Sequence, residues 1–210
     1  TSLPNFPDRK LFSPVEKSQS EVSTEPFRIL YHGSLTEHHG LDIAIKAVDI
    51  LRHKICPVKF TLYGIGPSEP EIRSMIRSFG LENIVEIKKP VPHEQVPEIL
   101  KNADIGVVPK KDGIFANEAL STKLFQYVAM GIPAVVSRTG AEKRYFGEDE
   151  VKYFTPQDPE DMARCVEELY EKPELRFAMA QRALRRIDEY SMTKNGKKYL
   201  SIISSLNKNR

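Results

Sequence analysis

The stretch G-I-F-A-N-E-A-L-S-T-K-L-F-Q-Y-V-A-M-G-I-P-A-V-V-S, residues 113–137, decides the fold. Its second half, from Gly131 to Ser137, has the composition of a buried parallel strand entered through a tight turn, because a glycine ends the preceding helix and a β-branched run follows Pro133. Its first half repeats apolar residues on one helical face, namely Leu120, Leu124, Phe125, Val128 and Ala129. The stretch therefore predicts a helix, a turn and a buried strand in direct succession.

The rest of the chain alternates short β-branched runs with amphipathic segments. Six strands are predicted, at residues 27–33, 58–64, 85–87, 104–109, 134–137 and 151–154. A helix is predicted over residues 41–54, where Ile43, Ala47 and Leu51 share one face. Strands that alternate with helices at this spacing favour one parallel sheet with helices on both faces. This is a Rossmann-like α/β fold, and its ligand crevice lies at the carboxyl ends of the strands.

Composition restricts the classes of function. The 210 residues hold 31 basic and 29 acidic side chains, and a net charge of +2 argues against a dedicated nucleic-acid-binding protein. Cys56 and Cys165 are too few for a disulfide framework, which favours a reducing, cytoplasmic location. No apolar run approaches the roughly 20 residues of a membrane-spanning helix. The chain begins at Thr1 without a methionine or a signal peptide, so a fragment or a processed chain is expected.

The stretch 113–137 resembles the donor-site signature of retaining GT-B glycosyltransferases. In that signature a glutamate, seven residues and a second glutamate precede an A-x-G-x-P-V-V turn and strand, and the resemblance is strongest to the branch that reads T-K-L-x-E-Y-x-A-x-G-I-P. The first glutamate of the family contacts the donor sugar and the second contacts the ribose. Here the first position is Glu118 and the second is Gln126. The resemblance implies the C-terminal, nucleotide-sugar-binding half of a GT-B fold.

The resemblance also implies a set of donor-binding residues around Glu118, the expected sugar-binding and catalytic carboxylate. Amides at the start of the helix would hold the diphosphate, because a helix N-terminus favours anions. Lys123 is the expected phosphate cation, with Lys110 and Lys111 assisting from the facing loop. The donor-binding residues implied are Gly33, Ser34, His39, Gly64, Lys88, Leu120, Ser121, Thr122, Lys123 and Gln126.

Two loops depart from the family pattern, and a third, at residues 64–69, has two interpretations. In residues 33–40, Ser34 and His39 replace an arginine and a lysine that bind the diphosphate in most relatives. Because a free histidine has a pKa of about 6.5, protonation of His39 toward pH 6 is expected to strengthen donor binding. Residues 64–69, G-I-G-P-S-E, only half-match a dinucleotide fingerprint, because Glu69 replaces its third glycine. The resemblance implies that this loop forms a wall of the nucleotide pocket, and a simple tight turn is the equal alternative. Lys89 replaces a glycine in the stretch expected to contact the base.

No cofactor and no metal is expected, because the nucleotide-sugar is a substrate. The resemblance implies that the helix dipole and side chains neutralise the leaving diphosphate without a cation. A metal site built from His32, His38 and His39 would lack a carboxylate or cysteine to complete it.

The predicted domains are a hinge and linker at 1–26, a nucleotide-sugar-binding domain at 27–190 and a crossover helix at 191–210. The linker is expected to lead from an N-terminal, acceptor-binding domain of the same full-length chain, which is the expected protein partner. Its first eleven residues are expected to pack poorly, apart from a small docking patch of Leu3, Phe6 and Phe12. A basic face between residues 182 and 198 predicts a solvated surface or, alternatively, a peripheral contact with anionic lipid at the inner face of the membrane.

The predicted function is the transfer of a sugar from a nucleotide-sugar to an acceptor, by a full-length enzyme of which this chain is the donor-binding half. The chain alone is expected to be inactive, because positioning of the acceptor supplies much of the rate. Two alternatives remain open. One is a GT-B-like epimerase or phosphorylase domain, and the other is a non-catalytic, degenerate nucleotide-binding module, which Ser34, His39 and Gln126 favour.

Overall fold

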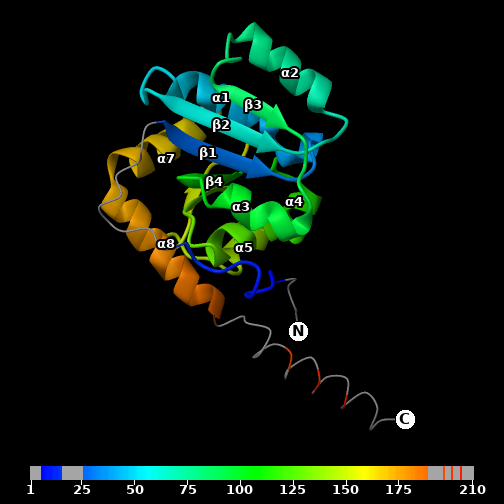
Figure 1. The fold of residues 1–210 in the computed structure, drawn as a ribbon, viewed down its shortest axis with the longest axis vertical. Helices are drawn as coiled ribbons and strands as arrows, with labels where there is room; N and C mark the ends of the chain where they lie inside the picture. Colours follow the sequence, from blue (N-terminus) through cyan, green and yellow to red (C-terminus); the bar gives the residue numbers. More distant parts are fainter. Residues whose placement is uncertain (1–5, 16–25, 189–195, 197–199, 201–203, 205–210) are drawn as a thin grey trace.

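The computed structural model describes residues 6–15 and 26–188 and the single positions 196, 200 and 204 (Figure 1). Its strands are β1 (Phe27–His32), β2 (Val58–Tyr63), β3 (Val85–Lys88), β4 (Ile105–Val108), β5 (Ala134–Ser137) and β6 (Lys152–Phe154). They form one six-stranded sheet in the order β3-β2-β1-β4-β5-β6, and every neighbouring pair is parallel. The predicted Rossmann-like α/β fold is confirmed.

Helices connect the strands. The longer ones are α1 (Leu41–Leu51), α2 (Glu69–Ser78), α5 (Thr122–Ala129), α7 (Pro159–Glu171) and α8 (Pro173–Asp188). Short turns of helix are η1 (Glu37–His39), η2 (His93–Gln95), α3 (Val96–Leu100), α4 (Ile114–Glu118) and α6 (Gly140–Lys143). The start of α7 follows the sequence signal, since Asp158 caps it by accepting the Asp161 amide at 2.9 Å.

Two hydrophobic clusters cover the two faces of the sheet. Successive strand side chains point to opposite faces, so Ile29 and Tyr31 of β1 join one cluster and Leu30 joins the other. The first cluster packs the sheet against α1, α2 and α7, and the second packs it against α3 and α5. Val135 and Val136 of β5 divide between the clusters in the same way. The carboxyl ends of all six strands therefore meet at one edge.

Helix α5 lies against the centre of the sheet because β4 carries a glycine there. A Cβ atom at Gly106 would stand 2.6 Å from the ring of Tyr127, so a larger residue would push α5 away. The hydroxyl of Tyr127 donates to the Leu30 carbonyl of β1 at 3.1 Å. These contacts hold α5 against the middle of β1 and β4.

The stretch 113–137 differs from its prediction in one respect. The helix, the turn and the strand are confirmed as α5, the turn at Gly131 and β5, but Glu118, expected just ahead of the helix, lies at the end of a further short helix, α4, and α5 begins at Thr122. The chain breaks between them because Ser121 is extended, with φ −80° and ψ 113°. The buried ammonium of Lys110 also holds the carbonyls of Ala116 and Ala119 at 2.9 and 2.7 Å.

Residues 6–15 pack more tightly than expected. Phe12 is completely buried in the second cluster, and the ring of Phe6 lies edge-on to that of Phe125 at 5.0 Å. The amide of Val15 donates to the Met130 carbonyl at 3.0 Å, and Arg9 donates to the Ala129 carbonyl at 3.2 Å. The expected docking patch is thus confirmed for Phe6 and Phe12, whereas the expectation of poor packing is wrong for Arg9, because the free carbonyls at the end of α5 compensate for the polar composition of the segment.

Other parts of the predicted organisation lie outside the described residues. These are the linker at 16–25, Leu3 of the docking patch, and nearly all of the crossover helix at 191–210. In the part of the chain that the structure describes, no helix combines the length and the apolar character needed to cross a bilayer.

Candidate functional site

The candidate site lies where the loops after β1 and β2 meet the N-terminus of α5, at the carboxyl edge of the sheet. Gly33 follows β1 with φ at 130°, and a Cβ there would lie 2.4 Å from Cε of Lys123. Gly64 follows β2, and a Cβ there would lie 2.0 Å from the Gly33 carbonyl oxygen. Two glycines thus let two loops and one lysine side chain close on each other. Gly33, Gly64 and Lys123 were all predicted as site residues from the sequence.

Lys123 supplies the positive charge of this site. Its ammonium lies 5.3 Å from the centre of the Tyr31 ring, and its alkyl chain packs against Gly33. Burial and the nearby charge of Lys110 lower the pKa of Lys123 to about 8, while Glu142 opposes that shift. Lys123 is therefore a desolvated cation that stands at a helix N-terminus, a combination that suits an anionic ligand.

The loop after β1 is ordered by its own side chains. Nδ1 of His39 lies 2.8 Å from the Ser34 carbonyl oxygen, so it carries the hydrogen and donates. The hydroxyls of Ser34 and Thr36 lie 3.2 and 3.1 Å from the same nitrogen. Burial and the charge of Lys123 lower the pKa of His39 to about 4. Burial and the Lys123 charge thus both oppose the protonation of His39 that was expected near pH 6.

The N-terminus of α5 is partly occupied by a carboxylate of the same chain. The amide of Ser121 donates to Oε1 of Glu142 at 3.1 Å, and this carboxylate is completely buried. Leu120 and Ser121 precede the helix, which begins at Thr122. The side chain of Ser121 caps no amide of α5. Glu142 therefore occupies the Ser121 amide, one of the amides at residues 120–122 that were predicted to hold the diphosphate.

Glu118 points to a neighbouring arginine across the surface. Its two carboxylate oxygens accept from the guanidinium of Arg144 at 3.1 and 3.3 Å, and both side chains are exposed. Hydrogen bonding to Arg144 and its positive charge keep the pKa of Glu118 below its ordinary value. Glu118 is therefore an ionised, solvent-accessible acceptor, held at the end of α4.

The two remaining predicted site residues lie at different distances from this centre. Gln126 is half-buried on α5, one turn after Thr122 and Lys123. Lys88 ends the edge strand β3, pairs with Glu86 at 3.1 Å and lies 5.7 Å from the centre of the Tyr63 ring. The structure joins Lys88 to the loop after β2 through its carbonyl, which accepts the Gly64 amide at 3.0 Å. The Lys88 ammonium itself is held by Glu86 and the Tyr63 ring.

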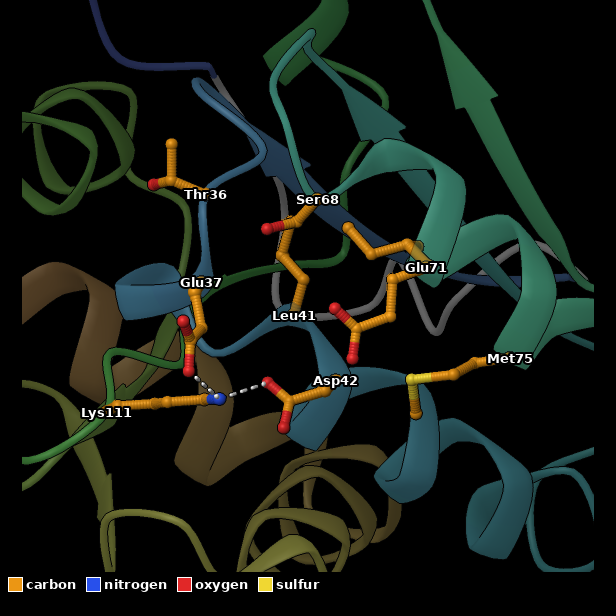
Figure 2. Close-up of a pocket in the computed structure, with 9 residues that line it drawn as sticks. Thr36, Glu37, Leu41, Asp42, Ser68, Glu71, Met75 and Lys111 are labelled. Carbon is orange, nitrogen blue, oxygen red and sulfur yellow. Dashed lines mark ion pairs between the residues drawn. The ribbon is translucent and has the colours of Figure 1, made fainter.

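Lys110 and Lys111 do not face the site as free cations. Lys110 pairs with the buried Glu142 at 2.8 Å. Lys111 pairs with Glu37 and Asp42 at 3.6 and 3.4 Å, beside a small pocket between η1, α1 and α2 (Figure 2). That pocket has a volume of about 60 Å³, which is room for a few water molecules and not for a nucleotide.

Helix α6 contributes three contacts that the sequence analysis missed. Its Gly140 amide donates to Oδ1 of Asn117 at 2.8 Å, Glu142 holds Ser121, and Arg144 after its end holds Glu118. The order Thr139-Gly-Ala-Glu142 is a capping-box pattern that could have predicted a helix start at this point. Nothing local in the sequence indicates that Glu142 turns toward α5.

Buried polar atoms without a partner gather at the same edge. Nε2 of His32, Oγ of Ser121 and Oγ of Ser137 make no hydrogen bond within the described residues. They belong to the end of β1, the start of α5 and the end of β5. Burial and the charge of Lys123 lower the pKa of His32 to about 3, so its ring is neutral. Among the described residues, no cluster of three or more His, Cys, Asp or Glu is arranged to hold a metal ion.

Two curated relatives show what kind of protein this chain is similar to. It is 32% identical to the amylovoran biosynthesis glycosyltransferase AmsK of Erwinia amylovora over 114 residues, which are 54% of this chain and 28% of that protein. It is 27% identical to the alpha-D-kanosaminyltransferase of Streptomyces kanamyceticus over 157 residues, 74% of this chain and 39% of that protein. The chain thus spans well under half the length of these relatives.

Solved structures give the same fold. The C-terminal domain of a group 1 glycosyl transferase from Francisella tularensis superposes with a TM-score of 0.72 at 16% identity, covering 86% of this chain and 96% of that domain. Anabaena HepE in complex with UDP superposes with a TM-score of 0.83 at 16% identity, covering 97% of this chain and 57% of that one. The sequence profile described as "Glycosyl transferases group 1" matches residues 13–186. Because that match covers most of the sequence, the chain belongs to the group 1 glycosyl transferases.

Proposed function

We propose that this chain is the C-terminal, donor-binding half of a retaining GT-B glycosyltransferase, and that it binds a nucleotide-sugar. The observation that carries the proposal is Lys123, a desolvated cation that packs against Gly33 at the N-terminus of α5. A diphosphate placed there would contact this ammonium and the amides of Thr122 and Lys123. HepE, a structural neighbour, was solved with UDP, which supports a nucleotide as the ligand class.

Each end of the ligand has a proposed partner. Glu118 accepts hydroxyl groups of the donor sugar, since it is ionised and accessible. Gln126 lies one turn along α5 and accepts or donates to the ribose. The helix dipole and Lys123 stabilise negative charge as it develops on the leaving diphosphate, which is the task that a metal ion performs in other transferases. The proposed mechanism therefore uses no metal.

The acceptor belongs to a different part of the full-length protein in this proposal. This chain covers 28% and 39% of the two relatives described above, so a further domain accounts for the rest of such a chain. We place the acceptor site on that N-terminal domain and the reaction in the crevice between the halves.

Two arginines of the basic face predicted between residues 182 and 198 make contacts within the chain. Arg182 donates to the Asp149 carbonyl and Arg186 to the Tyr145 carbonyl. This favours a structural role for those two arginines.

Calorimetry with two ligands tests the donor assignment. UDP, GDP, ADP and dTDP are titrated first, and then a nucleotide-sugar that carries the tightest of the four bases. Glu118→Ala is expected to weaken the nucleotide-sugar about tenfold, the value of a charge-assisted hydrogen bond, and to leave the nucleoside diphosphate unchanged. Glu71→Ala, beside the small pocket of Figure 2, is the matched control and should change neither affinity. Equal affinity of Glu118→Ala and the wild type for every sugar tried would refute the sugar-binding role.

A second function is favoured by one group of observations. Ser34 and the neutral His39 replace charged diphosphate ligands, and Gln126 replaces a carboxylate. These features suit a degenerate module that binds a nucleotide without catalysis. The calorimetry separates the two, because such a module would bind the nucleoside diphosphate but would gain nothing from the sugar.

A further inference from the structure

A buried ion pair lies directly behind the proposed donor site. Lys110 and Glu142 pair at 2.8 Å, with side chains 6% and 0% exposed, and they come from the loop after β4 and from α6. Each end is further bonded: Lys110 holds the carbonyls of Ala116 and Ala119, and Glu142 accepts from the Ser121 amide. The Thr139 hydroxyl donates to the second oxygen of Glu142. The pair thus touches both sides of the break between α4 and α5.

A buried ion pair needs a reason other than stability. Removing two charges from water costs several kcal/mol per ion, and an apolar pair of similar volume is often no less stable. In some proteins such a pair is retained because it specifies one arrangement of the chain. Here the arrangement they specify is the extended connection at 119–121, which separates Glu118 from the N-terminus of α5.

We propose that Lys110 and Glu142 are positioning residues for the donor site, which fix the N-terminus of α5 and set the charge environment of Lys123. This inference rests on the proposed function for its catalytic meaning. The carboxylate takes the Ser121 amide, so the next amides along α5 and the Lys123 ammonium remain for the ligand. The buried carboxylate of Glu142 thereby determines which amides of α5 are left to bind the diphosphate of the ligand.

The two charges of the ion pair act on the pKa of Lys123 in opposite directions. Glu142 favours the charged form of Lys123, and Lys110 disfavours it. Removing the charge of Glu142 therefore lowers the pKa of Lys123, and removing the charge of Lys110 raises it. The titratable groups that act on Lys123, or on which it acts, are Tyr31, His32, His39, Lys110 and Glu142. The two histidines are neutral near pH 7, so the charges of Lys110 and Glu142 are the ones that act on the pKa of Lys123.

The first test requires no nucleotide. The side-chain signal of Lys123 is titrated by NMR in the wild type, Glu142→Gln and Lys110→Met. We expect the midpoint to fall by about one pH unit in Glu142→Gln and to rise in Lys110→Met. Thr139→Val loses a hydrogen bond to Glu142 without a change of charge, and it should leave the midpoint in place. Unchanged midpoints in both charge variants would overturn the proposal, and so would shifts of the same sign.

The second test measures how the ion pair of Lys110 and Glu142 affects nucleotide affinity. The tightest of UDP, GDP, ADP and dTDP is titrated into the same variants between pH 6.5 and 9.5. Both charge variants should bind about tenfold more weakly at pH 7, and the alkaline loss of affinity should move with the Lys123 midpoint. Lys111→Met, from the adjacent residue, should behave as the wild type. If the wild type binds none of the four, the donor proposal fails, while the NMR result still decides the role of the pair.

Discussion

Lys123 is expected to determine how nucleotide binding depends on pH. An anion binds the protonated ammonium, and burial lowers the pKa of Lys123 to about 8. Affinity should therefore be constant between pH 6.5 and 7.5 and should fall as pH rises above about 8. His39 adds nothing in this range, because its pKa is lowered to about 4 by burial and by Lys123. Calorimetry across the range checks this, and a decline already complete by pH 7 would point to a histidine instead.

Gln126 offers a change that should strengthen binding. A carboxylate that accepts a ribose hydroxyl is worth roughly 1 kcal/mol more than a neutral amide, so Gln126→Glu should tighten nucleoside diphosphate binding about fivefold. The side chain is half-buried on α5, where screening by solvent limits repulsion from the diphosphate. Gln157→Glu, in the turn before α7, is the control for the added charge. Weaker binding by Gln126→Glu alone would mean that this position faces the phosphates and not the ribose.

At the scale of elements, the segment 6–15 acts as part of the core. Phe12 is completely buried against the second hydrophobic cluster, so Phe12→Ala should lower the free energy of unfolding by about 3–5 kcal/mol. Phe6 is half-buried and packs on Phe125 through one edge, so Phe6→Ala should cost clearly less. Denaturant unfolding monitored by circular dichroism measures both. A cost below 1 kcal/mol for Phe12→Ala would show that the segment is dispensable.

The break between α4 and α5 shows where reading local sequence reaches its limit. The apolar pattern from Leu120 to Ala129 predicted one helix with Glu118 just ahead of it, and the short helix α4 that ends at Glu118 was not predicted. The interruption is caused by Lys110 and Glu142, which approach from either side of the segment in the chain. Helix α6 was missed for a different reason, since four residues are too few for a period to be visible. Contacts between distant residues decided the first case, and the short length of the helix decided the second.

At the scale of the whole molecule, the sheet was predictable and the site only in part. Six β-branched runs, each ended by a glycine or a polar loop, indicated a parallel sheet and the edge where ligands bind. Gly33, Gly64 and Lys123, which the resemblance assigned to the donor site, lie together at that edge, and their role in binding stays a prediction. The ion pairs of Glu118 and Lys110, and the low pKa of His39, could not be predicted, because each depends on a neighbour that the fold brings in.

The chain alone is expected to transfer no sugar to an acceptor. It corresponds to 28% and 39% of two relatives, and we place the acceptor site in the remainder of such a protein. Without that half, the acceptor is not held in line with the donor, and positioning contributes much of an enzyme's rate. Incubation with a radiolabelled nucleotide-sugar and candidate acceptors measures this, and a full-length chain is the control. Robust transfer by residues 1–210 would show that the acceptor site is already present.

The central claim is that the edge formed by Gly33, Lys123 and α5 binds a nucleoside diphosphate. Its most direct test is calorimetry at pH 7 with UDP, GDP, ADP and dTDP on the wild type, Lys123→Met and Lys111→Met. At least one nucleotide should bind the wild type. Lys123→Met should weaken it ten- to a hundredfold, for the loss of roughly 1.5–3 kcal/mol, while Lys111→Met should match the wild type. Absence of binding by the wild type, or equal affinities for the two lysine variants, would contradict the account.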